Sequence, residues 1–421
     1  MKILVVGGGG REHAIIKKLK ENKEIETIYA LPGNGGIAAD AECYPIKAND
    51  IEGIVAFAAA HPVDFAVVAP DDPLVLGCVD RLEAMDIPCF GPHANAAIIE
   101  GSKVFSKNLK KKYGIPTAAS ETFEDPDKAI AYLAGVDYPT VIKADGLALG
   151  KGVVIAQSFD EAKTAIHEMM CDKCFGESGS RVLVEEFLTG PEVSVLSFTD
   201  GKVVVPMVSS MDHKRALDND QGLNTGGMGT VAPNPYYTPA VAEQCMKEIF
   251  LPTVAAMNAE GRTFKGCLYF GLMLTPKGPR VIEYNCRFGD PETQVVLPLL
   301  ESDLYTVMKA VHDGTLADTE VKFSEGAACC VVLASNGYPK KYESGFPMTL
   351  PETGAGEYLF VAGAKKDGDT VLTAGGRVLG ATATAQDLAT AVERAYCLAG
   401  KVHFENAYYR KDIGKRALAA K

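Results

Sequence analysis

The chain has 421 residues, 47% of them hydrophobic, and a formal net charge of −12. This length predicts two to four domains, and the acidic balance argues against nucleic acid as a partner. No apolar run approaches the roughly 18 residues that a membrane span needs, so no membrane contact is expected. An odd number of cysteines, eleven, and no recognisable signal peptide predict reduced thiols and a cytoplasmic location.

The first stretch predicts a strand, a glycine turn and a helix. Residues 2–6 form an apolar β run, residues 7–10 supply the glycine turn, and a helical pattern reaches about residue 20. This arrangement points backbone N–H groups and a helix N-terminus at an anion. A dinucleotide site is disfavoured because Glu12 stands where the third glycine of its fingerprint belongs. A small phosphorylated ligand fits better, and a purely structural turn is the alternative.

The first hundred residues are expected to form an open, parallel α/β domain. Residues 64–69 have the composition of a buried parallel strand, followed by a helix from about 74 to 85 and a strand at 88–90. In such a domain the ligand-binding loops lie at the carboxyl edge of the sheet.

Two lysine-bearing elements come next. Ser102 is expected to cap a helix that carries Lys107. Residues 140–156 then comprise two β runs around a glycine-rich turn. A hairpin of this kind can fold over phosphates while Lys143 and Lys151 neutralise them, although its spacing is not that of a Walker P-loop. A purely structural hairpin is the alternative.

A hinge and a polar loop are expected in the middle of the chain. Residues 185–192 resemble a hinge between strands, where acids and exposed backbone can receive a nucleoside while Phe187 and Leu188 pack on its ring. Residues 209–215 form a dense polar cluster, and residues 224–229 form a glycine-rich loop with too little apolar content for a regular element. Long glycine-rich loops in compact domains are usually functional or disordered.

The most informative stretch ends a predicted β-hairpin at residues 266–275 and 280–285. Side chains alternate along a strand, so Glu283, Asn285 and Arg287 are expected to share a face. A carboxylate and an amide oxygen form a hard-oxygen pair suited to magnesium, and the arginine can hold a phosphate or a carboxylate. A polar strand end with a solvated face is the alternative.

Several longer motifs occur in a fixed order along the chain. They are Gly-Gly-Arg-Glu-His at 9–13, Pro-Gly-Asn at 32–34, Gly-Ser-Lys at 101–103, Lys-Ala-Asp-Gly-Leu-Ala at 143–148, Asp-His-Lys-Arg at 212–215, Asn-Thr-Gly-Gly-Met-Gly at 224–229, Asn-Cys-Arg-Phe-Gly-Asp-Pro-Glu at 285–292, Gly-Gly-Arg-Val-Leu at 375–379 and Arg-Lys-Asp-Ile-Gly at 410–414. Together they closely resemble the phosphoribosylamine–glycine ligase family, ATP-grasp enzymes of purine biosynthesis. The resemblance covers essentially the whole chain.

The resemblance implies an α/β protein with four parts. These are an N-terminal open parallel α/β domain that binds phosphoribosylamine (1–101), a small ATP-grasp domain with its linker helix (102–192), a large catalytic ATP-grasp domain (193–325) and a small C-terminal α/β domain (326–421). The last is expected to contain short strands and one helix, at 385–399. A monomer or weak homodimer is expected.

The implied reaction joins glycine to 5-phosphoribosylamine. ATP first phosphorylates glycine to glycyl phosphate, and the amine then displaces phosphate, giving glycinamide ribonucleotide. ATP and Mg²⁺ (or Mn²⁺) are therefore the expected cofactors. Such chemistry depends on positioning and charge neutralisation, so lysines, arginine and a metal should outnumber nucleophiles.

Site residues follow from matching the family motifs to this sequence. The residues expected to contact ATP are Lys107, Lys143, Gly150, Lys151, Gly152, Glu185, Glu186, Phe187, Leu188 and Glu192. The expected metal ligands are Glu283 and Asn285, and the expected catalytic residues are Asp212, Lys214 and Arg287. The substrates are expected to contact Gly9, Gly10, Arg11, Glu12, Asn34, Asp71, Asn224, Thr225, Gly226 and Gly227. His213 is expected to be structural.

Three positions depart from the family pattern. Asp71 replaces the usual glutamate, and Leu223 replaces a proline before the 224–229 loop. Gly271 stands where many ATP-grasp enzymes have a second metal-binding carboxylate, so ATP oxygens or water must complete the metal's coordination. The alternatives are another ATP-grasp ligase or carboxylase of purine synthesis, an NAD-dependent oxidoreductase built on the first domain, and a non-catalytic nucleotide-binding module.

Overall fold

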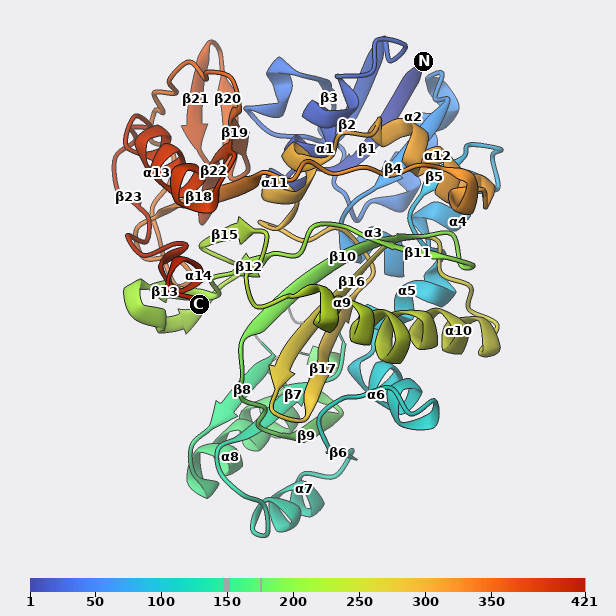
Figure 1. The fold of residues 1–421 in the computed structure, drawn as a ribbon, viewed down its shortest axis with the longest axis vertical. Helices are drawn as coiled ribbons and strands as arrows, with labels where there is room; N and C mark the ends of the chain where they lie inside the picture. Colours follow the sequence, from blue (N-terminus) through green and yellow to red (C-terminus); the bar gives the residue numbers. More distant parts are fainter. Residues whose placement is uncertain (147–151, 175, 421) are drawn as a thin grey trace.

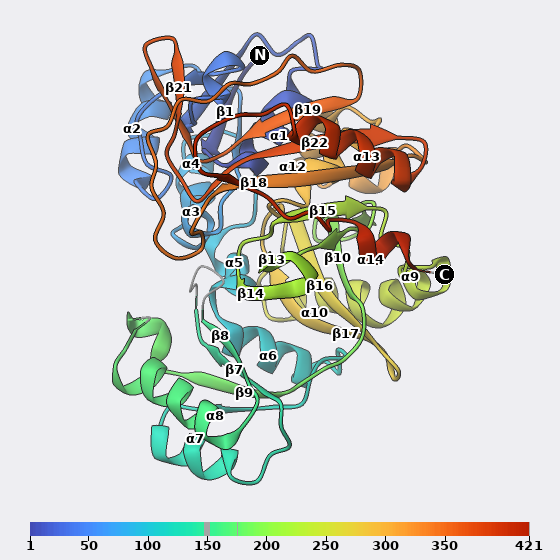
Figure 2. The same ribbon diagram turned by 90° about the vertical axis from the view of Figure 1, so that its left-hand side faces the viewer.

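The computed structural model describes residues 1–146, 152–174 and 176–420 (Figure 1). The N-terminal unit and the C-terminal strands lie side by side at one end, and a small four-stranded unit lies at the other (Figures 1 and 2). A larger antiparallel sheet lies between these two ends. Within the described residues, no helix combines the length and apolar character needed to cross a membrane.

The N-terminal sheet is parallel, as predicted. Its strands, in spatial order, are β3 (Glu42–Cys43), β2 (Thr27–Pro32), β1 (Lys2–Gly7), β4 (Phe65–Val68) and β5 (Cys89–Phe90). The helices of this part are α1 (Gly10–Leu19), α2 (Ile51–Ala60), α3 (Asp71–Val75), α4 (Cys78–Glu83) and α5 (Ala94–Gly101). Residues 3–6 of β1 are all apolar, which suits a strand buried on both faces: Ile3 and Val5 belong to one hydrophobic core, and Leu4 and Val6 to another.

The single helix predicted from 74 to 85 is wrong. The structure has two short helices there, α3 and α4, separated at Gly77. Gly77 has a φ of +82°, which side-chain-bearing residues rarely adopt. The turn redirects the chain so that Leu74 and Leu82 both reach the core.

The small unit has its own hydrophobic core. Its antiparallel strands, in spatial order, are β6 (Ser120–Phe123), β9 (Val182–Glu186), β7 (Thr140–Ala144) and β8 (Val153–Ala156). Its helices are α7 (Pro126–Leu133) and α8 (Phe159–Ile166), the latter continuing as a π-helix over His167–Cys171. The predicted β7–β8 hairpin is confirmed, but Gly150 and Lys151 in its turn lie outside the described residues.

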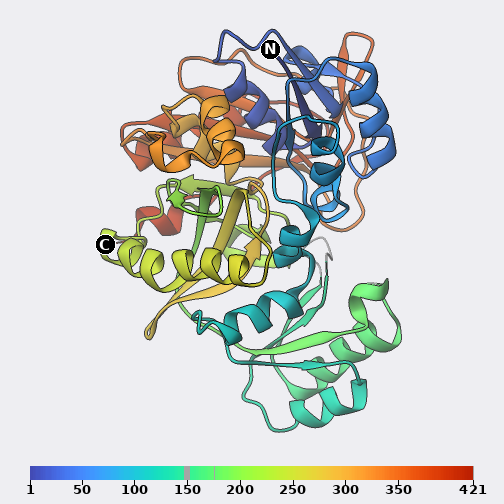
Figure 3. The ribbon, with the colours of Figure 1, turned by 90° about the vertical axis from the view of Figure 1, so that its right-hand side faces the viewer.

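A helix and two linkers join the small unit to the rest of the protein. α6 (Lys103–Lys112) begins at Ser102, whose side chain accepts a hydrogen bond from the Phe105 N–H, as predicted. Figure 3 shows α6 between the N-terminal unit and the small unit. After α6, Thr117 forms a β-bridge with Val281 of the large sheet. The small unit is therefore anchored by the same strand that carries Glu283.

The large sheet is antiparallel. Its strands, in spatial order, are β11 (Val204–Pro206), β10 (Glu192–Thr199), β16 (Gly266–Thr275) and β17 (Gly278–Asn285), which confirms the predicted hairpin. Its helices are α9 (Pro239–Cys245) and α10 (Leu251–Ala259), joined by a π-helical turn. Phe250 and Met257 are among the fully buried residues of this layer.

The C-terminal sheet takes strands from two parts of the sequence. Its strands are β12 (Met211–Asp212), β15 (Gly229–Ala232), β18 (Ala327–Ser335), β22 (Arg377–Ala385) and β19 (Glu357–Val361), with β23 (Ala407–Tyr408) beside β18. β18 and β22 have nine residues each, longer than the short strands expected. The predicted helix is α13 (Leu388–Ala399). Two short hairpins accompany the sheet, β13 (Arg215–Leu217) with β14 (Gln221–Asn224) and β20 (Ala364–Asp367) with β21 (Thr370–Thr373).

Three further helices complete this part of the chain. They are α11 (Thr293–Val296), α12 (Leu304–Asp313) and α14 (Lys415–Leu418). The motif at 212–215 starts at the last residue of β12, and the motif at 224–229 ends at the first residue of β15, so both motifs adjoin the C-terminal sheet.

Glycine-to-alanine substitutions in the two linkers of the small unit are expected to differ in their effect on stability. Gly190 has a φ of +147°, and a Cβ there would lie 2.1 Å from the Leu274 carbonyl oxygen. Gly114, in the other linker, has a φ of +67° and open space around it. We expect Gly190→Ala to lower the free energy of unfolding by more than about 2 kcal/mol, and Gly114→Ala by about 1 kcal/mol. Urea denaturation followed by circular dichroism measures both. Equal shifts would contradict the steric argument.

Candidate active site

Glu283 lies at the centre of the candidate site, half-buried on β17. The Nζ of Lys214 lies 3.5 Å from its Oε1. Lys214 lowers the pKa of the Glu283 carboxyl, burial opposes this, and further cations lower the pKa again: Lys143, Lys103 and Arg287. Four cationic side chains from four segments therefore act on one carboxylate.

The predicted metal pair shares a face of β17. Tyr284 points into the core, so its neighbours Glu283 and Asn285 point away from it. Gly271 pairs directly with Glu283, and a Cβ there would lie 2.9 Å from the Glu283 Cγ. Across the described residues, no three His, Cys, Asp or Glu side chains gather as a metal-binding group. A carboxylate and an amide oxygen on one face fit a hard cation that takes its other ligands from a substrate.

Glu185 forms a buried ion pair with two lysines. Its carboxylate lies 3.0 Å from the Nζ of Lys107 and 2.9 Å from the Nζ of Lys143. Burial alone would raise the pKa of Glu185, but the two lysines outweigh it and lower the pKa to about 2. Lys107 also donates to Thr117 Oγ1 and to the Ala118 carbonyl, so all three of its protons have acceptors. Lys143 also donates to the Ile282 carbonyl oxygen, next to Glu283 in the sequence, at 3.3 Å.

The other described residues predicted to contact ATP lie at or next to the ends of β8, β9 and β10. Glu186 ends β9, Phe187 and Leu188 follow it, and Phe187 is unusually exposed for an aromatic residue, at 39%. Glu192 begins β10, with its Oε2 3.3 Å from the Nζ of Lys214. Gly152 directly precedes β8. Lys214 thus links Glu192, which is predicted to contact ATP, to Glu283, which is predicted to bind the metal.

Arg287 lies just beyond the strand and is held by an acid that was not predicted. Its Nη2 lies 3.1 Å from Glu100 Oε1, and its Nη1 donates to the Phe288 carbonyl oxygen. Burial opposes its charge, but Glu100 and Asp71 raise the pKa of the guanidinium. The buried Nε of Arg287 has no hydrogen-bond partner among the described residues. An arginine with a free, buried donor is suited to an anionic ligand.

Residues 224–227, which are expected to contact the substrates, fold back onto the backbone of Lys214. The Thr225 N–H and hydroxyl both donate to the Lys214 carbonyl oxygen, at 2.7 and 2.9 Å. Arg377 donates to the Gly226 carbonyl at 2.9 Å and to the Asp290 carbonyl at 2.7 Å. Burial raises the pKa of Asp212 well above its usual value. Asn224 ends β14 and leads into this turn.

The carboxylate of Glu12 caps the N-terminal glycine turn. Glu12 accepts from the Gly9 N–H at 2.6 Å and from Arg11 Nε at 2.7 Å. Gly10 begins α1. Asn34 donates to the carbonyl oxygens of Gly8 and Val361 and accepts from two backbone N–H groups. The Glu12 carboxylate and the Asn34 amide therefore shape the turn through hydrogen bonds to its backbone.

Three charged residues of the site were not predicted. Glu100 directly precedes the quoted Gly-Ser-Lys motif, Lys103 is the last residue of that motif, and Arg377 lies within the quoted Gly-Gly-Arg motif. The motifs could be recognised in the sequence. The packing of distant elements, however, determines which of their residues point into the site. Nothing local to positions 100 and 287 indicates that these two residues pair.

His213 is expected to make stability depend on pH. Its Nε2 accepts from the Gly414 N–H and its Nδ1 donates to the Gly229 carbonyl, which requires the neutral ring. Burial, followed by Arg410, lowers its pKa from 6.5 to about 4. Folding therefore gains up to about 3 kcal/mol from this residue above pH 6.5, and this gain is lost as pH falls toward 4.

Urea midpoints measured between pH 4 and pH 7 test this dependence. His213→Gln should flatten the profile in that window, and the control His167→Gln, at an exposed position, should leave it unchanged. A profile of His213→Gln with the wild-type slope would contradict the assignment.

Comparisons with known proteins cover the whole chain. Family models for phosphoribosylglycinamide synthetase match in three segments: the N domain at residues 1–100, the ATP-grasp (A) domain at 101–293 and the C domain at 328–416. The phosphoribosylamine–glycine ligase of Clostridium acetobutylicum is 45% identical over 415 residues, which are 99% of this chain and 100% of that protein. That of Rhizobium meliloti is 47% identical over 420 residues, covering 100% of this chain and 99% of that protein.

Solved structures agree with the sequence comparisons. The crystal structure of phosphoribosylamine–glycine ligase from Thermotoga maritima matches with a TM-score of 0.88 and 36% identity, covering 98% of this chain and 100% of that one. A biotin carboxylase from Campylobacter jejuni, solved as a β-γ-ATP complex, matches with a TM-score of 0.75 at 14% identity, covering 97% and 92% of the two chains. At that identity the likeness concerns the fold alone.

The α/β fold class and the family expected from the motifs are both confirmed. Three family segments and relatives of full length show that the chain belongs to the phosphoribosylglycinamide synthetase family of ATP-grasp ligases.

Proposed function

We propose that the protein joins glycine to 5-phosphoribosylamine, with ATP as the energy source, and produces glycinamide ribonucleotide, ADP and phosphate. Membership of the family supports the overall reaction. The observation that carries the proposal is the group of four cations around Glu283, one of which, Arg287, has a free, buried donor. Such a group suits a transferring phosphoryl group, whose negative charge must be neutralised.

In the first step, a carboxylate oxygen of glycine attacks the γ-phosphorus of ATP. The bond from that phosphorus to the β-bridging oxygen breaks, which leaves ADP and glycyl phosphate. Lys143, Lys103 and Lys214 balance the charge on the phosphates, and Arg287 orients the acid or the phosphate in transfer. Glu283 and Asn285 would hold Mg²⁺ (or Mn²⁺), which supplies further neutralisation when it is bound.

In the second step, the amine of phosphoribosylamine attacks the carbonyl carbon of glycyl phosphate. The carbon–oxygen bond to phosphate breaks, and the amine nitrogen loses a proton. A neutral amine is already nucleophilic, so His213 is not needed as a base. The leaving phosphate can take this proton, and Asp212, whose Oδ1 accepts from the His213 N–H at 2.7 Å beside Gly227, would help to orient the amine. The 224–227 turn and the N-terminal glycine turn would orient the acceptor.

We further propose that the protein works in the cytoplasm. All eleven cysteines carry free thiols in the structure, which fits a reducing compartment. The expected monomer or weak homodimer stays a prediction, as do the predicted domain boundaries.

A coupled ATP assay across candidate acids tests the reaction. Purified protein should release phosphate rapidly only when glycine and phosphoribosylamine are both present with ATP and Mg²⁺. Replacing glycine with alanine, formate or bicarbonate serves as the control series. Equal phosphate release with another acid would contradict glycine as the substrate, and bicarbonate-dependent release would favour a carboxylase.

Glu283→Gln tests the centre of the site. The change removes the carboxylate from the metal pair and leaves Lys214 without one of its partners, so we expect kcat to fall on the order of 100-fold or more. A steady-state assay with a Mg²⁺ titration measures this, and a circular dichroism spectrum verifies the fold. The control Glu301→Gln, at an exposed position, should retain full activity. Wild-type activity in Glu283→Gln would remove this residue from the site.

A further inference from the structure

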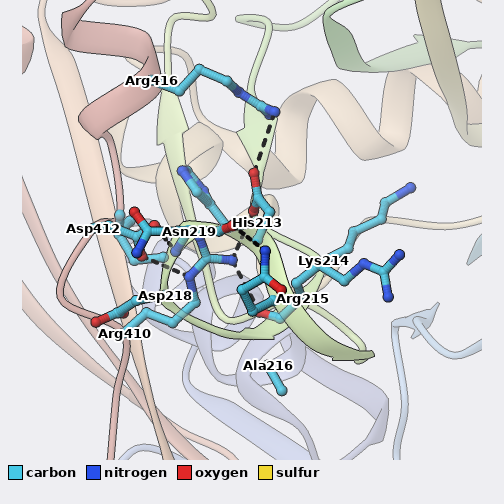
Figure 4. A network of polar contacts seen from close by, with 12 residues as sticks. His213, Lys214, Arg215, Ala216, Asp218, Asn219, Arg410, Asp412 and Arg416 are labelled. Carbon is cyan, nitrogen blue, oxygen red and sulfur yellow. Dashed lines mark hydrogen bonds and ion pairs between the residues drawn. The ribbon is translucent and has the colours of Figure 1, made fainter. Parts of the chain in front are cut away.

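Arg410, in the C-terminal part of the chain, is almost fully buried although it carries a charge. Only 1% of it is exposed. Its Nε and Nη2 donate to the two carboxylate oxygens of Asp412, both at 2.8 Å. Its Nη1 donates to the Arg215 carbonyl at 3.0 Å and to Asp220 Oδ1 at 3.1 Å (Figure 4). The guanidinium therefore connects the C-terminal tail to the segment that follows Lys214.

Further hydrogen bonds join the same two segments. The Asn219 N–H donates to Asp412 Oδ2 at 2.8 Å, and the Lys411 N–H donates to Asp218 Oδ1 at 2.7 Å. The Tyr408 hydroxyl donates to the Ala216 carbonyl at 2.9 Å. Figure 4 shows the C-terminal side chains gathered on one side of the hairpin that contains these residues.

That hairpin, β13–β14, has little support of its own. Its strands have three and four residues, and they pair only with each other in the described sheets. Leu217 is 48% exposed, and the first three residues of β14 are exposed. A two-stranded hairpin of this size is marginally stable by itself. Its order therefore depends on the tail that Arg410 belongs to.

Lys214 directly precedes this hairpin, and Thr225 directly follows it. The Lys214 backbone is tied to Thr225, and its Nζ lies 3.3 Å from Glu192 and 3.5 Å from Glu283. An open cavity of about 290 Å³ lies beside the network, lined by side chains that include those of His213, Asn219 and Arg410, so the hairpin has room to shift if a contact is lost. Displacement of a charged group by about 1 Å can reduce a rate about 100-fold.

We propose that Arg410 is a positioning residue: by holding the β13–β14 hairpin it keeps Lys214 against Glu283 and Glu192. The C-terminal part of the chain then contributes to phosphoryl transfer without touching the reacting atoms. The inference rests on the proposed function, because that function assigns Lys214 to the phosphoryl-transfer step.

Arg410→Lys is the main variant, because it keeps the charge and loses the planar fork that reaches several acceptors at once. Its control is Arg394→Lys, since Arg394 binds the Thr384 and Ala355 carbonyl oxygens within the C-terminal part, and among the described residues it makes no hydrogen bond or ion pair with the hairpin. We expect Arg410→Lys to lower kcat at least about ten-fold while the KM values for ATP and glycine stay within about two-fold. Arg394→Lys should keep all three values within about two-fold.

A second variant addresses the case in which Arg410→Lys does not fold. The Tyr396 hydroxyl donates to the Arg410 carbonyl and accepts from the Ile413 N–H, both at 2.8 Å. Tyr396→Phe removes these bonds with little change in volume. It should lower kcat in the same way but by a smaller factor, about three-fold.

A double variant of Arg410 and Lys214 distinguishes a positioning role of Arg410 from general destabilisation of the protein. In a Lys214→Met background, Arg410→Lys should cause no further loss of kcat, because the group it positions is gone. Hydrogen exchange of residues 215–224 provides a readout that does not depend on the reaction: it should be faster in Arg410→Lys and unchanged in Arg394→Lys. Three results would each overturn the proposal. The first is a double variant whose loss of kcat is the product of the two single losses. The others are a kcat of Arg410→Lys equal to that of Arg394→Lys, and unchanged hydrogen exchange of residues 215–224 in Arg410→Lys. An inactive wild type with faster exchange in Arg410→Lys would instead contradict the proposed function.

Discussion

The neutralisation of Glu283 is the interaction on which the arrangement of the active site depends. A half-buried carboxylate needs compensating charge, and here it comes from four places: Lys143 on the small unit, Lys103 at the start of α6, Lys214 before the β13–β14 hairpin, and Arg287 beyond β17. These segments are separated in sequence and belong to different layers of the fold. Bringing them together requires that the small unit, the linker helix and the large sheet all be folded, so the site exists only in the complete protein.

The stretch after β17 joins the N-terminal and C-terminal parts to that centre. Arg11 donates to the Phe288 carbonyl, and Arg377 donates to the Asp290 carbonyl. Glu100 accepts from the Cys286 N–H as well as holding Arg287. The N-terminal and C-terminal parts of the chain thus contact the same few residues after β17. Phosphoryl and acyl transfer both gain from such preorganisation.

Much of the fold follows from local patterns. The apolar run of β1, the cap at Ser102 and the β16–β17 hairpin are encoded by neighbouring residues, and strand alternation sufficed to place Glu283 and Asn285 on one face. Other features could not be inferred locally. The break at Gly77 depends on a backbone angle, and the pairing of Arg287 with Glu100 depends on how α5 packs against the end of β17. The residue types of the site were therefore predictable from the motifs, whereas their partners were set by tertiary packing.

We propose that these cations serve a phosphoryl group that passes to the carboxylate of glycine. Glycine labelled with ¹⁸O in both carboxylate oxygens tests it directly. If glycyl phosphate forms, one labelled oxygen becomes the bridge to phosphorus and leaves with it, so each inorganic phosphate released during turnover should carry one ¹⁸O. Unlabelled phosphate, released at the same rate as glycinamide ribonucleotide forms, would show that the carboxylate oxygen never bonds to phosphorus and would contradict the account.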